Sequence, residues 1–217
     1  MGRTIDLDTW ARREHFLLFR DFEKPHFSVT ATVDVSACYA ASRGEGSSFT
    51  LAVLCAAMRA ANAVQAFRLR IRGDEVWRHD AVGIGCTVLR PDRTFGFSYF
   101  AHEPSFARFM DEGKVEMERA RTSTTLADER ETDDATLHAT VLPWIRFTSF
   151  TNAMRREDSV PKLTFGQRYA EGVAHAGVRG GAPRAGGRNR RGGVLRAAPG
   201  SARPPATARL TGLTAGG

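Results

Sequence analysis

The distribution of aromatic side chains places the strongest limit on what this chain can fold into. All 14 phenylalanines, 3 tryptophans and 3 tyrosines lie before Gly172. The segment 172–217 consists mostly of Gly, Ala, Arg and Pro. Such a segment buries too little apolar surface to offset the entropy lost on ordering. We therefore predict one globular domain over residues 1–171 and a disordered tail over residues 172–217.

The net charge of +7 belongs to the tail. Segment 172–217 carries 8 arginines and no acid, so the other 23 Lys and Arg face 24 Asp and Glu. The globular part therefore has no basic excess that would attract nucleic acid. The tail contains Arg-Gly-Gly twice, at Arg179–Gly181 and Arg191–Gly193, which leaves a nonspecific nucleic-acid-binding arm as an alternative. It has no aromatic residues on which bases could stack, so we expect no specific nucleic-acid partner.

The remaining broad features indicate a cytoplasmic protein. No apolar run is long enough to cross a bilayer. The first residues include acids and lack the apolar core of a signal peptide. The three cysteines, Cys38, Cys55 and Cys86, have neither paired nor ligand-like spacing, which is typical of buried thiols in a reducing compartment.

Hydrophobic periodicity predicts an α+β fold, a two-layer sandwich of a mixed sheet with helices. Three segments have helical spacing: Thr9–Arg20, which Asp8 can cap, Phe49–Gln65 and Ser105–Arg121. Segments that read as strands are His26–Val35, Phe67–Ile71, Glu75–Arg78, Ile84–Leu89, Thr94–Phe100, Thr136–Leu142 and Lys162–Phe165. Two hairpins are expected, at Gly73-Asp74 and at Arg90–Arg93.

Three groups of short motifs follow one another in a specific order. The first group is Trp10–Phe16, Phe27–Thr30 and Val33–Val35; the second is Ala61–Ala63, Phe67–Ile71, Thr87-Val88 and Thr94-Phe95; the third is Leu142–Phe150 and Pro161–Gly166. In order and spacing, over about four-fifths of its length, the chain resembles the chloramphenicol acetyltransferase family.

The resemblance implies a cytoplasmic homotrimer with active sites at the subunit interfaces. Acetyl-CoA is the expected co-substrate, a small chloramphenicol-like alcohol is the expected acceptor, and no metal is expected. In the family a histidine in a His-His-x-x-x-Asp-Gly motif, shortly after the Thr-Phe-Gly strand, is the general base. This sequence lacks that motif, and His175 is its sole histidine beyond that strand.

A shifted reading frame accounts for the missing motif. We read the codons of His175–Asn189 one base late, taking CGN codons for arginine and choosing the third bases. The result is Met-Pro-Val-Ser-Val-Glu-Ala-His-His-Ala-Leu-Val-Asp-Gly, which contains the motif at the expected place. No fixed base forbids it. We therefore hypothesise a small insertion or deletion near the codons of Glu171–Ala174.

The resemblance also suggests residues for the site. Thr140 occupies the position of a family serine that supports the tetrahedral intermediate; the alternative is a threonine chosen for strand propensity. Arg12 matches an arginine that pairs with the Asp of the missing motif, against the alternative of a solvated helix residue. If Arg12 is buried, loss of its partner costs about 3–5 kcal/mol.

Five further residues match family positions around the acceptor. Phe19, Phe27 and Phe95 match pocket positions, and each is equally well explained as core. Phe19 replaces a family tyrosine, which leaves the acceptor open. Trp144 and Thr164 also match positions near the site, with a core role as the alternative for Trp144.

The other histidines suggest no metal site. His26, His79, His102 and His138 lack ligand-like spacing and read as surface or hydrogen-bonded residues. Two functions therefore stay open: an inactive, frameshifted O-acetyltransferase, or a non-catalytic scaffold with a genuine basic tail.

Overall fold

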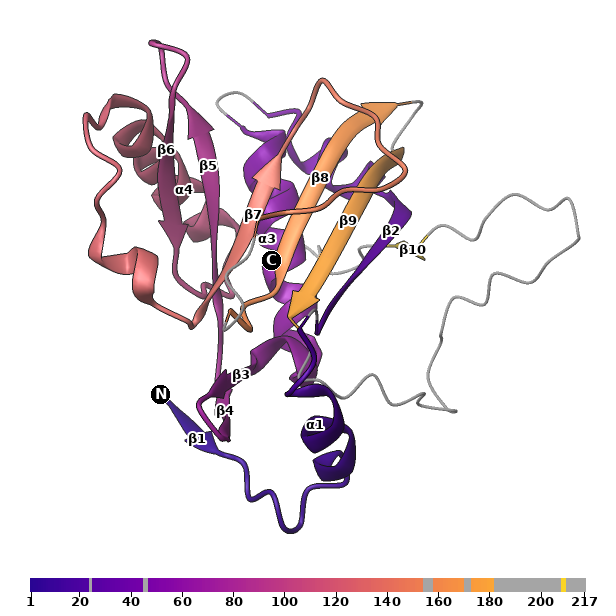
Figure 1. Ribbon diagram of the computed structural model, residues 1–217. Helices are drawn as coiled ribbons and strands as arrows, with labels where there is room; N and C mark the ends of the chain where they lie inside the picture. The colour runs from indigo at the N-terminus through magenta and orange to yellow at the C-terminus, as the bar shows by residue number, and fades with distance from the viewer. Residues whose placement is uncertain (24, 45–46, 154–157, 170–172, 182–207, 210–217) are drawn as a thin grey trace, which may run out of the picture.

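The computed structural model describes residues 1–23, 25–44, 47–153, 158–169, 173–181 and 208–209 (Figure 1), and side chains as far as Tyr169. Its main element is a seven-stranded mixed sheet in the order β10-β2-β9-β8-β7-β5-β6. The strands are β2 (His26–Asp34), β5 (Gly83–Leu89), β6 (Phe95–Phe100), β7 (Thr136–Val141), β8 (Lys162–Tyr169), β9 (Val173–Gly181) and β10 (Ala208–Arg209).

Helices α3 (Phe49–Ala63) and α4 (Phe106–Thr122) cover one face of this sheet. The core forms between the two layers, where α3 packs against alternate residues of the strands, such as Ile84 and Cys86 of β5 and Leu137 and Ala139 of β7. Because successive strand residues point to opposite faces, the intervening residues face away from the helices. Helix α2 (Ser36–Ala41) precedes α3.

A three-stranded sheet in the order β1-β4-β3 forms a separate lower layer. It consists of β1 (Gly2–Thr4), β3 (Leu69–Arg72) and β4 (Glu75–His79). Helix α1 (Arg13–Phe19) packs on it through Phe16, which is fully buried with Leu69 and Val76. The short helices η1 (Gln65–Arg68) and η2 (Glu129–Thr132) precede β3 and β7.

Local interactions fix the start of two helices and one turn close to the positions predicted from the sequence. The Ser48 hydroxyl accepts a hydrogen bond from the Leu51 amide and caps α3, and Ser105 caps α4 in the same way through the Arg108 amide. Gly73 has φ +59° in the tight turn between β3 and β4, a conformation that glycine adopts at little cost. Both predicted hairpins are present.

The fold class and the main helices and strands predicted from periodicity are confirmed. The first helix is shorter than predicted, and Asp8 does not cap it. The Thr9 hydroxyl donates to the Asp6 carboxylate, and the Trp10 amide donates to the Leu7 carbonyl, so the chain forms turns before α1 begins at Arg13. These local bonds compete with helical ones.

Strand β9 lies beyond the predicted boundary at residue 171. It pairs antiparallel with both β2 and β8, with His26 opposite Gly181 and Lys162 opposite Arg179. Backbone hydrogen bonds of this kind need no particular side chain, so composition alone did not predict a strand there. Residues 182–207 and 210–217, which make up most of the predicted disordered tail, lie outside the described residues.

Candidate active site

A wide cleft opens on the sheet face that points away from α3 and α4. Its volume is about 1010 Å³, and β5, β6, β7, η2 and the segment that returns from β7 to β8 enclose it. Because strand residues alternate, Thr87, His138, Thr140 and Lys162 are brought to this face together. Other lining residues are Gly85, Cys86, Phe97, Tyr99, Glu131, Thr132, Asp133, Asp134, Ala139, Asn152, Ala153, Asp158 and Val160.

Two predicted site residues are neighbours at this cleft. Thr140 on β7 and Thr164 on β8 are partners in the parallel ladder. Thr140 lines the cleft and is partly exposed, whereas Thr164 is 1% exposed. The amide of Asn152 donates a hydrogen bond to the Thr164 hydroxyl over 3.2 Å, which fastens the return segment to β8. Within the described residues the Thr140 hydroxyl forms no hydrogen bond, whereas the Thr164 hydroxyl holds the return segment through Asn152.

A polar triad in the cleft was not predicted from the sequence. The Lys162 ammonium lies 2.6 Å from a carboxylate oxygen of Asp158 and 3.2 Å from Nδ1 of His138. Burial, and then the charge of Lys162, lower the pKa of His138 to about 4, although Asp158 opposes them. His138 is therefore neutral near pH 7. The sequence could have indicated that His138 belongs to the site, because His138 lies two residues before Thr140 on the same predicted strand.

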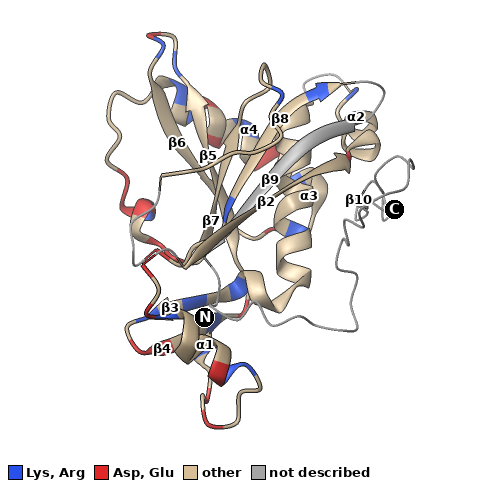
Figure 2. Ribbon diagram, turned by 45° about the vertical axis from the view of Figure 1, so that its right-hand side comes forward, with Lys and Arg blue, Asp and Glu red and all other residues tan. Residues whose placement is uncertain are grey.

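The wall beside η2 is held by charged side chains. Glu116 on α4 accepts hydrogen bonds from Arg119 and from the Tyr99 amide, and Arg130 lies 4.9 Å from the centre of the Tyr99 ring. The hydrogen bond from Arg130 lowers the pKa of Asp128 to about 2. Figure 2 shows the acidic residues that follow the chain between α4 and β7. This network fixes one side of the cleft.

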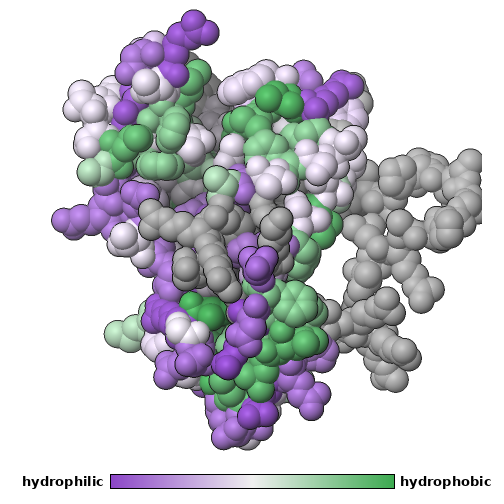
Figure 3. Space-filling view, in the orientation of Figure 1, coloured by the Kyte–Doolittle hydropathy of each residue, from purple (hydrophilic) through white to green (hydrophobic). Residues whose placement is uncertain are grey.

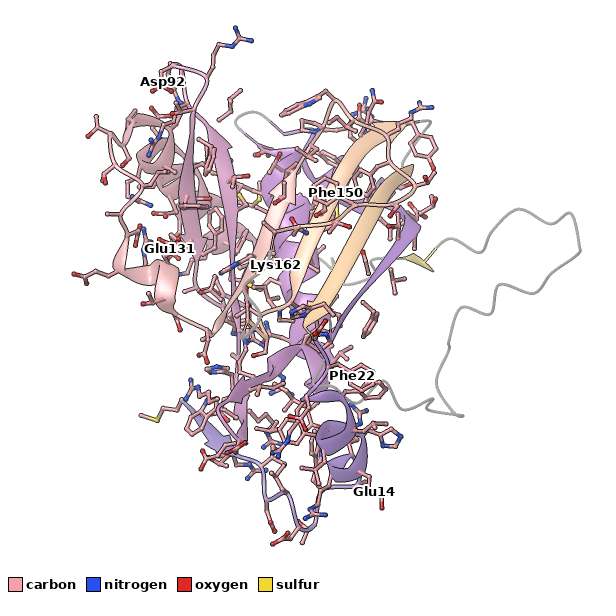
Figure 4. The ribbon with its side chains drawn as sticks, viewed as in Figure 1. Glu14, Phe22, Asp92, Glu131, Phe150 and Lys162 are labelled. Carbon is pink, nitrogen blue, oxygen red and sulfur yellow. The ribbon has the colours of Figure 1, made fainter. Side chains whose placement is uncertain are left out.

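Glu131 and Lys162, both labelled in Figure 4, line the same cleft. Cys86 faces the core and reaches the edge of the cleft. Burial raises the pKa of its thiol to about 11, so it is not a thiolate at neutral pH. In the part of the chain that the structure describes, no three His, Cys, Asp or Glu residues gather as a metal site would require.

The predicted burial of all three cysteines is confirmed. His79 shares a hydrogen bond of 3.0 Å with Asp134 and His102 is exposed, which matches the prediction of hydrogen-bonded or surface histidines. No helix within the described ranges is long and apolar enough to cross a membrane.

The remaining predicted site residues lie away from the cleft within one chain. Phe27 on β2 and Phe95 on β6 stand near opposite edges of the sheet, with 53% and 46% of their surfaces exposed. Trp144 is 62% exposed in the return segment, so none of the three is core. Phe19 is half-buried against Phe22. In Figure 3 apolar surface gathers near α1 and over β5 and β6.

Arg12 directly precedes α1 and is half-buried. Its backbone carbonyl accepts from the Phe16 amide, and among the described residues its guanidinium has no hydrogen-bond partner. The structure therefore places Arg12 in the lower layer, separate from Thr140 and Thr164.

Sequence comparison finds similarity to one protein family in the family models and in individual relatives. Residues 2–174 match the family model described as chloramphenicol acetyltransferase. A chloramphenicol acetyltransferase of Streptomyces acrimycini is 32% identical over 173 residues, which are 77% of this chain and 77% of the relative. Chloramphenicol acetyltransferase 2 of Escherichia coli is 28% identical over 171 residues, 77% of this chain and 80% of the relative.

Solved structures agree with this similarity. A structure named chloramphenicol acetyltransferase superposes with a TM-score of 0.74 at 26% identity, covering 82% of this chain and 88% of the other. The dihydrolipoamide acetyltransferase of Azotobacter vinelandii gives a TM-score of 0.58 at 15% identity, over 79% of this chain and 78% of the other. At that identity, the second match concerns the fold alone.

Proposed function

Because this chain belongs to the chloramphenicol acetyltransferase family of acyltransferases, we propose that it derives from an enzyme that acetylates a small alcohol. The donor is acetyl-CoA, the acceptor is a chloramphenicol-like antibiotic hydroxyl, and no metal takes part. The chain as translated has lost its general base through a change of reading frame, and we expect it to be inactive.

The proposed loss of the general base rests on where the similarity to the family ends. The family match ends at residue 174, next to the change of composition at Gly172, and it leaves about a quarter of the Streptomyces acrimycini relative unmatched. Strand β9 ends at Gly181, and in the shifted frame the His-His pair begins in the codon of Ala182. The motif would therefore begin directly after a strand that borders β8 and its Lys162 end.

The chemistry explains why this loss is severe. Acyl transfer joins the acceptor oxygen to the thioester carbon, and the thiol leaves with a proton. A base must remove the hydroxyl proton, and a donor must stabilise the oxyanion. In our proposal Thr140, which lines the cleft, donates its hydroxyl to that oxyanion, and Thr164 and Asn152 support the wall behind it. No proposed residue supplies the base.

His138 cannot replace the missing base in the arrangement described. Its Nδ1 faces the Lys162 ammonium, which only donates hydrogen bonds, so the ring proton lies on Nε2. Nδ1 is then occupied, and Nε2 has no lone pair to accept a proton. Among the described residues His138 is the one imidazole that lines the cleft, and it can donate a hydrogen bond but cannot remove the proton of a hydroxyl.

We further propose that subunits of a cytoplasmic homotrimer share the site. Within one chain Phe27 and Phe95 are too widely separated across the sheet to contact one acceptor. Their exposed apolar surfaces, with that of Trp144, support a packed interface, and we propose that Phe19 and Arg12 also contribute to the shared site. The enzyme-derived domain covers residues 1–171, and the tail 172–217 is the out-of-frame product.

Sequencing the gene across codons 165–190 tests the frame change directly. We expect one additional or missing base near codons 171–174 relative to a frame that encodes His-His-x-x-x-Asp-Gly. A stop codon in the shifted frame before the His-His codons would overturn the proposal. In parallel, a thiol-release assay with acetyl-CoA and chloramphenicol should show no turnover by this chain and turnover after the frame is restored.

A further inference from the structure

The protonation of His138 is determined by its neighbours. Asp158 uses one carboxylate oxygen to accept from the Val160 amide over 2.8 Å and the other to pair with Lys162. The paired ammonium reaches Nδ1 of His138. Since an ammonium has no acceptor, Nδ1 must be the acceptor and Nε2 must carry the hydrogen. Burial and the Lys162 charge keep the ring neutral by lowering its pKa to about 4.

The Nε2 donor belongs to the cleft. His138 and Thr140 are two residues apart on β7, so both side chains lie on the open face, and both line the cleft. Within the described part of the chain, no residue forms a hydrogen bond with Nε2. The imidazole that carries this donor therefore borders the cleft together with Thr140.

The charges around the cleft restrict what this donor can bind. Glu131, Asp133, Asp134 and Asp158 line it, and Lys162, the one Lys or Arg among the described lining residues, is already paired with Asp158. An anionic group would meet mostly carboxylates, whereas an uncharged oxygen can accept from Nε2 without electrostatic cost.

We propose that His138 is a specificity-determining residue whose Nε2–H donates a hydrogen bond to an uncharged oxygen of the acceptor, with Lys162 and Asp158 holding the imidazole in that tautomer. This rests on the proposed function, because it assumes that the acceptor binds in the cleft. It assigns His138 a role in recognition, and it selects neutral or cationic acceptors with a hydroxyl, carbonyl or nitro oxygen over carboxylates and phosphates.

Binding of chloramphenicol to the full-length chain, measured by isothermal titration calorimetry at pH 7.5, tests the inference without any need for turnover. We expect His138→Phe, which keeps the ring volume and loses the donor, to weaken binding about five- to tenfold, the loss of one hydrogen bond. His138→Gln should weaken it less, because its amide can donate. The matched control His102→Phe changes an exposed histidine and should bind as the parent does.

A second measurement addresses the tautomer. Nitrogen-15 NMR of the parent should show His138 protonated on Nε2, and Lys162→Met should shift the ring toward a mixture of tautomers. Circular dichroism confirms that each variant is folded. Parent-like binding by His138→Phe, or an Nδ1-protonated ring in the parent, overturns the inference and leaves the proposed function intact. Absence of chloramphenicol binding by the parent overturns the inference, whereas the proposed acceptor is overturned only if the frame-restored chain does not turn over chloramphenicol.

Discussion

Arg72 and Asp134 form a two-pronged ion pair that joins the two sheets. Arg72, the last residue of β3, donates from Nε and Nη2 to the two carboxylate oxygens of Asp134, each over 2.8 Å. Asp134 lies two residues before the start of β7. Asp134 also contacts the buried His79, and Arg70, 1% exposed, donates to its carbonyl. Although burial opposes it, hydrogen bonds from His79 and Arg72 lower the pKa of Asp134. The wall of the cleft is thereby attached to the lower layer.

We predict that Asp134→Ala lowers the free energy of unfolding by about 2–3 kcal/mol, since it removes several hydrogen bonds to a charged group and leaves His79 without this partner. Urea denaturation at pH 7 measures the loss. Glu129→Ala, an exposed carboxylate of η2, is the control and should change the free energy of unfolding by less than about 0.5 kcal/mol. Equal stability of the two variants would contradict the role given to Asp134.

The neutral state of His138 predicts a loss of stability in mild acid. Its pKa is about 4 in the folded chain and 6.5 without the fold, so the unfolded state binds more protons between these values. Stability from this group is therefore complete above pH 6.5 and is lost as the pH falls toward 4, by about 1–3 kcal/mol. His138→Gln should flatten the stability profile in this window, whereas His102→Gln should leave it unchanged.

Thr140 should matter only after the reading frame is restored. In the corrected enzyme, Thr140→Ala removes the proposed oxyanion donor and should lower kcat about a hundredfold or more, with a small change in KM. Thr140→Ser keeps the hydroxyl and should retain most of the rate. Thr148→Ala, an exposed threonine of the return segment, serves as the matched control. A full rate with Thr140→Ala would remove Thr140 from the mechanism.

Gly166 allows the return segment to lie close to β8. A Cβ at this position would lie 2.8 Å from the Phe147 ring and 2.9 Å from the Ile145 carbonyl. Gly166→Ala should therefore destabilise the chain by about 1–3 kcal/mol, because the backbone carbonyl cannot move freely. Gly44→Ala, whose Cβ would lie 3.3 Å from the Ser47 hydroxyl alone, is a milder comparison. Thermal unfolding of both variants measures the difference, and an equal loss in the two would contradict the close approach at Gly166.

Truncation separates the two hypotheses for the tail. A chain ending at Gly181 keeps β9, whereas a chain ending at Glu171 loses it and exposes the edges of β2 and β8. We expect the shorter chain to be less soluble than the longer one. If the arginines bind nucleic acid nonspecifically, affinity should fall with salt and with removal of residues 182–217. Sequence-specific binding would instead favour a genuine tail and would count against the frame change.

The sequence by itself determined the local elements and the family. Alternation in His26–Val35, the apolar run of Phe49–Gln65 and the two turn signals predicted elements within a few residues of those observed. Such patterns depend on neighbours close in sequence, where side-chain direction follows from backbone geometry. The missing His-His motif and the change of composition at Gly172 are likewise properties of the sequence alone.

The tertiary structure decided which residues share the cleft. Lys162 and His138 are 24 positions apart, yet the parallel register of β7 and β8 places them opposite each other. Strand β9, which comes from a segment with little hydrophobic content, similarly pairs with β2 on one side and β8 on the other. Pairings between distant strands depend on backbone hydrogen bonds and on packing of the whole sheet, and neither leaves a periodic signal in a single segment.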